Sequence, residues 1–140
     1  MNILKIESDF LKGLFGKESS KYIMTEYDGK VGYSDSYYIA FVPKNDAHVR
    51  CDRNFDFEKI LHDRKEREQA DYTYTITAKA GNLARYERVD GQGHAYINVK
   101  YTKYFSQNAE YRVAGQKDFV TVYENDDLFG IILPVNIKEG

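Results

Sequence analysis

Two segments of this 140-residue chain carry the same order of apolar runs and turns. Ser8 lies 90 positions before Asn98, which is also a good helix-capping residue, and Pro43 lies 91 positions before Pro134. These are the only two prolines, and each follows the apolar run that closes its segment. The agreement in order and spacing favours an internal duplication over a chance likeness of two short stretches. The other matching pairs are Leu14 with Tyr104, Phe15 with Phe105, and Tyr22 with Tyr111.

The first segment, residues 2–43, has the pattern of a β-α-β-β-β unit. Residues 2–6 are expected to form a short strand, and Ser8 is expected to cap the helix that follows it. Asp28-Gly29 is a strong signal for a two-residue hairpin. The remaining strands are expected at residues 21–27, 30–34 and 37–42.

The second segment, residues 83–137, repeats the pattern with Asn98 as the helix cap. Its strands are expected at residues 95–97, 110–114, 119–124 and 128–133, after a weaker strand at 83–89. Residues 44–82 match neither copy and read as an insertion. They predict a helix that starts at Asn54 or Asp56, and then an alternating strand over 71–79.

These elements predict one α+β domain over residues 1–140. One copy alone is too small to cover the apolar face of its own antiparallel sheet. Two copies packed about a pseudo-twofold axis can share a core, with both short helices on one side. The expected fold is therefore a tandem β-α-β-β-β repeat with an inserted helix and strand.

Composition narrows the possible functions. The formal net charge of −2 predicts neither a nucleic-acid-coating protein nor an acidic DNA mimic. With a single cysteine, Cys51, the chain forms no intrachain disulfide, which favours a reducing compartment. The first residues lack the pattern of a signal peptide, and no run approaches the roughly 20 apolar residues of a membrane span. The chain is expected to be cytoplasmic and not bound to a membrane.

The closing run, residues 128–137 (LFGIILPVNI), is similar to the last strand of bacterial sliding-clamp domains, and residues 98–123 resemble the clamp pattern of helix, strand, turn and strand. The resemblance covers residues 2–43 and 83–137. The whole chain also resembles a family of small proteins carried by prophages and mobile elements. These resemblances imply a non-enzymatic module of clamp-like fold that binds a protein partner. The alternative they imply is a DNA-tracking processivity factor, which needs a homo-oligomeric ring because this chain supplies one domain.

In sliding clamps the helices line the central hole and present basic side chains to DNA. The matching candidates here are Lys12, Lys17, Lys100 and Lys103. They would suit weak phosphate contact without sequence preference. Ordinary solubilising lysines on exposed helices have the same pattern.

Aromatic residues give the second set of candidates. The chain has thirteen tyrosines and no tryptophan. Tyr37 and Tyr38, and the row formed by Tyr72 and Tyr74, could leave aromatic patches for a protein partner. Cross-strand packing within the sheet is the alternative explanation for such tyrosines.

Catalytic and metal chemistry find little support. His48, Cys51 and His62 lie close in sequence, but a structural zinc site needs four ligands and no further pair has suitable spacing. Cys51 could act as a nucleophile only with a helper such as His48 or His94, which makes a small cysteine-dependent enzyme the third hypothesis. We therefore expect no enzyme activity, no catalytic residues, no metal and no cofactor.

Overall fold

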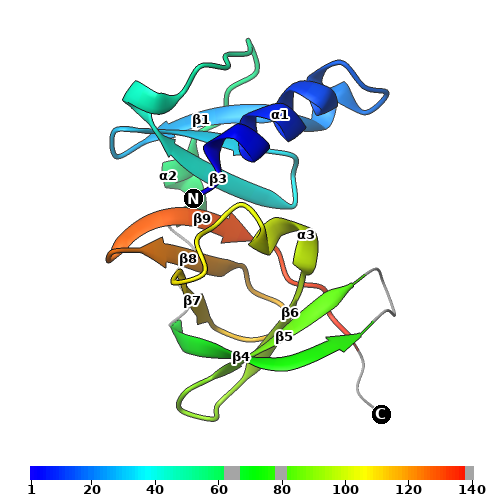
Figure 1. Ribbon diagram of the computed structural model, residues 1–140, viewed down its shortest axis with the longest axis vertical. Helices are drawn as coiled ribbons and strands as arrows, with labels where there is room; N and C mark the ends of the chain where they lie inside the picture. The colour runs from blue at the N-terminus through cyan, green and yellow to red at the C-terminus, as the bar shows by residue number, and fades with distance from the viewer. Residues whose placement is uncertain (62–66, 78–81, 138–140) are drawn as a thin grey trace. The chain divides into compact units, whose positions relative to one another are not determined.

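The computed structural model describes residues 1–61, 67–77 and 82–137 (Figure 1). The chain divides into two compact units, Met1–Arg64 and Lys65–Gly140. Each is mostly antiparallel sheet with short helices, so the chain belongs to the α+β class. The expectation that residues 1–140 form a single domain stays a prediction.

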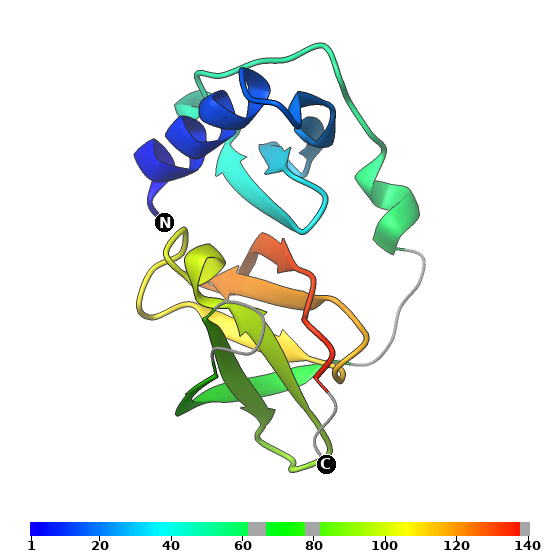
Figure 2. The ribbon, with the colours of Figure 1, turned by 90° about the vertical axis from the view of Figure 1, so that its right-hand side faces the viewer.

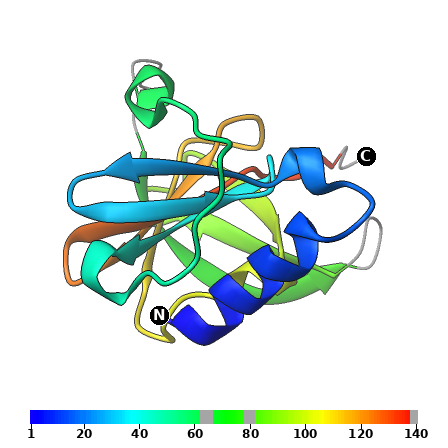
Figure 3. The same ribbon diagram turned by 90° about the horizontal axis from the view of Figure 1, so that it is seen from above.

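Unit 1 is a three-stranded antiparallel meander in the order β1-β2-β3. Asp28 and Gly29 both have positive φ, at 51° and 72°, as a two-residue hairpin turn requires, so the predicted hairpin is confirmed. Helix α1 runs obliquely beside these strands (Figure 3). The elements of unit 1 are α1 (Ile3–Leu14), η1 (Ser19–Lys21), β1 (Ile23–Tyr27), β2 (Lys30–Ser34), β3 (Tyr38–Pro43), η2 (Lys44–Asp46) and α2 (Phe57–Leu61).

The predicted first strand, residues 2–6, is wrong because these residues begin α1. The helix is capped by Asn2, whose side chain accepts a hydrogen bond from the Lys5 N–H at 3.1 Å, and not by Ser8. Ile6 and Phe10 follow the helical period and are fully buried. The first unit thus has the order α-β-β-β, and the first strand of the expected repeat is absent from it.

After β3 the chain crosses unit 1 as a long segment that ends in α2 (Figure 2). This segment covers the outer edge of β1, where the Met24 N–H donates to the Arg53 carbonyl at 2.8 Å and the Phe55 N–H donates to the Met24 carbonyl at 2.9 Å. Asp56 accepts a hydrogen bond from the Glu58 N–H at 3.0 Å at the start of α2, which confirms the predicted helix start.

Unit 2 is a six-stranded antiparallel sheet in the order β9-β8-β7-β4-β5-β6. The order β6-α3-β7-β8-β9 agrees with the expected second copy, and Asn98 caps α3 by accepting the Lys100 N–H at 3.0 Å. Both units therefore share the order α-β-β-β, while duplication itself stays a prediction. The elements are β4 (Glu68–Thr77), β5 (Leu83–Arg88), β6 (His94–Asn98), α3 (Val99–Thr102), β7 (Glu110–Val113), β8 (Val120–Glu124) and β9 (Asp127–Ile132).

Strand β4 comes from the predicted insertion, yet it lies inside the sheet. Ala70 faces Tyr111 of β7 on one side and Arg88 of β5 on the other. The segment is thus not an appendage to the second copy, because its strand joins β7 to the β5-β6 hairpin. Elsewhere in the core of unit 2, Gly130 of β9 leaves room for the buried ring of Phe105.

We expect Gly130→Ala to destabilise the chain by about 1–3 kcal/mol, because a methyl group there would overlap the Phe105 ring. Urea unfolding followed by circular dichroism measures the change. Gly115→Ala is the matched control, since a methyl group at that position meets nothing within 4 Å. Equal stability of the two variants would contradict the packing argument.

Candidate functional site

Four tyrosines of unit 2 form a continuous row of rings across three strands. Tyr111 of β7 and Tyr86 of β5 have ring centroids 4.5 Å apart, and Tyr86 and Tyr72 of β4 are 5.5 Å apart. Tyr72 and Tyr74 follow at 4.9 Å. The strand register produces this row, because Tyr72 pairs directly with Tyr86 and Ala70 pairs with Tyr111. We call these four residues the tyrosine row.

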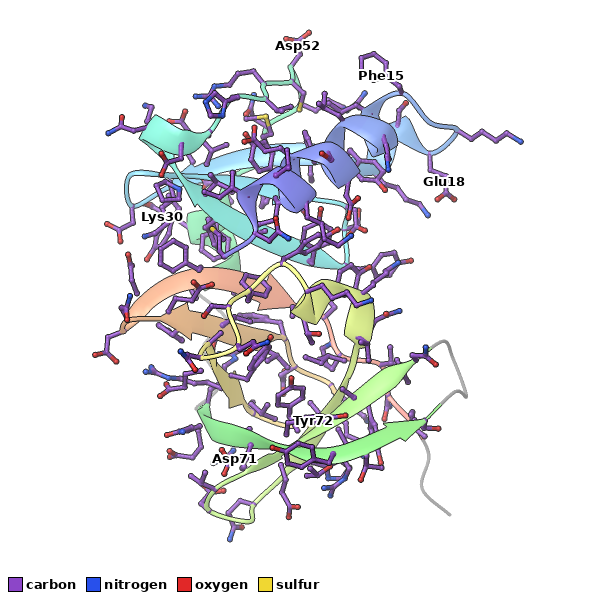
Figure 4. The ribbon with its side chains drawn as sticks, viewed as in Figure 1. Phe15, Glu18, Lys30, Asp52, Asp71 and Tyr72 are labelled. Carbon is purple, nitrogen blue, oxygen red and sulfur yellow. The ribbon has the colours of Figure 1, made fainter. Side chains whose placement is uncertain are left out.

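The row runs from the core to the surface. Tyr111 and Tyr86 are buried, whereas the Tyr74 side chain is 88% exposed (Tyr72 is labelled in Figure 4). Burial raises the pKa of Tyr86 to about 12. It also raises the pKa of Tyr111 above the ordinary range, and the two hydroxyl groups hydrogen-bond each other. The buried end is therefore a fixed support for the exposed end.

A β-bulge sets the direction of Tyr74. The β4–β5 register shifts between Tyr72 and Ile76, and Tyr74 has a φ of 58°. An aromatic residue in this left-handed region is strained by about 1–2 kcal/mol. The Thr73 hydroxyl, which donates to the Arg85 carbonyl at 3.1 Å, holds the distorted strand. Bulges often re-aim a side chain, and this local geometry presents the ring to solvent.

The other two predicted tyrosines lie in unit 1 and differ in exposure. The Tyr37 side chain is 52% exposed, whereas Tyr38, the first residue of β3, is only 3% exposed. Asp35 shapes the preceding turn by accepting hydrogen bonds from both backbone N–H groups, at 2.9 and 3.3 Å. Of this pair, only Tyr37 offers its ring to solvent.

All four candidate DNA-facing lysines are exposed. Lys12 lies in α1, but Lys17 lies beyond its end. Lys100 lies in α3, and Lys103 is the residue that caps its C-terminus. The two pairs belong to different units.

Cys51 and His48, the candidate nucleophile and helper, each contact another group. The Cys51 thiol donates to the Arg53 carbonyl at 3.4 Å, and the His48 ring lies 3.4 Å from Glu7. His94 belongs to unit 2, where its ring packs edge-on against Tyr96. His62 lies outside the described residues. Among the residues that the structure describes, no group of three or more His, Cys, Asp or Glu side chains could hold a metal ion.

Sequence reasoning missed the buried Glu7 carboxylate. It accepts the backbone N–H groups of His48 and Val49, both at 2.9 Å, and the Tyr33 hydroxyl at 3.4 Å. The Tyr33 hydroxyl also lies 2.8 Å from the Val49 carbonyl, and burial raises the pKa of Tyr33 to about 12. Because these contacts tie a loop to α1, we interpret Glu7 as a structural residue. A helix predicted from residue 3 would have placed Glu7 on the buried face.

A surface depression of about 440 Å³ lies elsewhere in unit 2. It is shallow and is bordered by His94, Lys117, Asp118 and turn residues. Its charged side chains include both signs, so its chemistry favours no particular ligand. The tyrosine row is the more specific arrangement.

Comparisons with protein-family models, curated proteins and solved structures find no match for this chain. No helix in the described part of the chain is long and apolar enough to cross a membrane. The candidate site therefore rests on its geometry.

We expect Tyr74→Asn to leave stability unchanged or to raise it by up to about 1 kcal/mol. Asparagine tolerates positive φ, and this relief offsets the roughly 0.5–1 kcal/mol of lost ring contact. Urea unfolding measures the change, with Tyr86→Ala as the buried counterpart, expected to lose about 3–5 kcal/mol. A large loss at Tyr74 would mean that its ring serves the fold.

The raised Tyr86 pKa predicts a loss of stability at alkaline pH. The folded state keeps this proton while the unfolded chain, with a pKa near 10, releases it. The stabilisation is therefore complete below pH 10 and is lost as the pH rises through about 12, by about 1–3 kcal/mol. The free energy of unfolding, measured with urea, should fall more steeply with rising pH for the native protein than for Tyr86→Phe. The same dependence of stability on pH in the two proteins would contradict the raised pKa of Tyr86.

Proposed function

We propose that this chain is a non-enzymatic protein-interaction module that binds its partner through the exposed end of the tyrosine row, Tyr72 and Tyr74. The observation that carries the proposal is the position of Tyr74, a large and exposed ring on the strained backbone of a β4 bulge. A regular strand would pack this ring against its neighbours at lower cost. The sliding-clamp-like fold and the origin in a phage or mobile element belong to the same proposal.

The energetics support a protein partner. Tyrosine is enriched among the residues that dominate protein interfaces, because it buries a large area and has few rotatable bonds to immobilise. Here part of that entropy is already lost, since the Tyr74 ring packs against Tyr72 and the Tyr72 ring packs in turn against the buried Tyr86. A rigid ring gains more net affinity from the same contact area.

A DNA-tracking homo-oligomer is the alternative. The exposure of Lys12, Lys17, Lys100 and Lys103 is what phosphate contact requires. The surface beside Lys12, however, includes the exposed apolar residues Leu11 and Phe15, which phosphate contact does not use. A stable monomer in sedimentation that ignores duplex DNA at low salt would exclude the alternative.

The test of the proposed function is capture of a partner by the immobilised chain, followed by affinity measurement with the purified partner. We expect Tyr74→Asn to weaken binding by about tenfold or more, as for a residue at the centre of an interface. Val89→Ser is the matched control, because Val89 is also an exposed apolar residue of unit 2.

Unchanged affinity of Tyr74→Asn for every captured protein would refute binding through the tyrosine row. Loss of affinity in Val89→Ser as well would point to a general effect of surface polarity.

A further inference from the structure

Helix α1 carries apolar side chains on two faces, and unit 1 buries only one of them. Ile6 and Phe10 are fully buried, with the Phe10 ring 4.8 Å from that of Tyr33. On the second face, Leu4 is 79% exposed, Leu11 40% and Phe15 87%. Phe15 lies at the C-terminal end of α1, and its ring points away from the strands (Figure 4). We call Leu4, Leu11 and Phe15 the α1 stripe.

The stripe has the geometry of a helix-packing seam. Its members are spaced by seven and four residues, which places them within an arc of about 40° on an ideal helix. They extend for about 16 Å along the helix axis. Scattered exposed apolar residues are normal on a protein surface, but three in line on one helix are typical of an interaction site.

The carboxylate of Glu7, which lies between Leu4 and Leu11 on the helix, is buried and hydrogen-bonded, and the exposed charges near the stripe that remain unpaired are positive. Lys5 pairs with Asp9 at 3.4 Å and Lys21 pairs with Glu18 at 3.1 Å, so these acidic groups are already neutralised. Lys12 and Lys17 flank Phe15 and form no ion pair with any residue that the structure describes. A partner of this stripe should therefore bring apolar groups together with carboxylates.

We infer that the α1 stripe binds an acidic amphipathic helix of a partner protein. A helix of the partner would lie along α1, place its own apolar row against Leu4, Leu11 and Phe15, and direct carboxylates at Lys12 and Lys17. The inference does not rest on the tyrosine row, which lies in the other unit. It adds a second, separate binding surface to the chain.

A second copy of this chain fits the stripe poorly. It would bring the same unpaired lysines to the seam, where like charges repel.

An anionic lipid surface fits poorly for a different reason. A helix that lies in a membrane interface presents a broad apolar face, commonly 100° or wider. Here the remaining apolar face of α1 is occupied by the sheet, through contacts such as that of Phe10 with Tyr33. The narrow exposed stripe matches the groove between side chains of a single helix.

Two synthetic helical peptides of about 20 residues test the inference, a length sufficient for stable helix in an alanine-rich sequence. Both carry the same leucine row; one places glutamates beside it and the other places lysines. Fluorescence anisotropy measures their affinity for the full chain. We expect the glutamate peptide to bind at least tenfold more tightly than the lysine peptide, and more weakly as salt is raised.

Variants of the stripe and of its charges make the test specific. Phe15→Ser and Leu4→Ser should each weaken binding of the glutamate peptide by about tenfold, because each removes a large contact from the seam. Tyr37→Ser is the matched control, as an exposed ring of unit 1 outside α1, and should bind normally. The double variant Lys12→Glu with Lys17→Glu should reverse the preference and select the lysine peptide. Circular dichroism confirms that each variant is folded.

Any of four results would overturn the inference. These are equal affinity for the two peptides, no measurable binding of the glutamate peptide, binding that survives Phe15→Ser, or an unreversed preference in the double lysine variant. Sedimentation and flotation with phosphatidylserine vesicles examine the other occupants. A dimer abolished by Phe15→Ser, or vesicle binding abolished by it, would assign the stripe to a second copy or to lipid instead.

Discussion

The sheet of unit 2 depends on strand β4, which is paired on both of its edges. Residues Glu68–Ala70 pair with β7, and the strand pairs with β5 on either side of the bulge. In the strand order of the sheet, β4 is the strand that lies between the β5-β6 hairpin and β7-β8-β9. Because both ends of β4 are fixed by ladder hydrogen bonds, the sheet can hold the strained backbone at Tyr74 between them. The exposed ring is thus a consequence of how firmly the strand is held.

Unit 1 depends on a buried polar group in a comparable way. Glu7 lies on the inner face of α1 and accepts backbone hydrogen bonds from His48 and Val49. A buried carboxylate is costly unless it is hydrogen-bonded, so the loop and the helix need each other. The contact also fixes the rotation of α1 about its axis. Ile6, Glu7 and Phe10 form the buried face, and Leu4 and Leu11 lie at its edge and stay exposed, which links the fold of this unit to its proposed binding surface.

Sequence patterns predicted the elements whose signals are local. The Asp28-Gly29 hairpin, the Asn98 cap and the strands β5 to β9 follow from turn residues and alternation. Residues 2–6 were predicted wrongly because so short a run does not distinguish a strand from the first turn of a helix. The decisive signal was Asn2, which caps the helix and was instead taken as the first residue of the strand.

Other features could not have been predicted because they depend on distant partners. The alternation of Tyr72, Tyr74 and Ile76 is that of a regular strand, and the bulge arises only from register with β5. The burial of Tyr38 beside the exposed Tyr37 likewise depends on which face of β3 is covered. Among the candidate tyrosines, the sequence identified Tyr72 and Tyr74 but gave no indication that Tyr86 and Tyr111 would support them.

The two proposed surfaces differ in the physics of recognition. The α1 stripe combines apolar contact with two positive charges, so its attraction to an acidic helix acts over roughly a Debye length, about 8 Å at physiological ionic strength. The charged neighbours of the tyrosine row include Arg85 and Glu87, which pair with each other at 3.0 Å. The tyrosine row is therefore expected to select its partner by shape and by contact with the Tyr74 ring, which packs against Tyr72. A chain with both surfaces can guide one partner by charge and retain another by contact, and the two can vary independently because they lie in separate units.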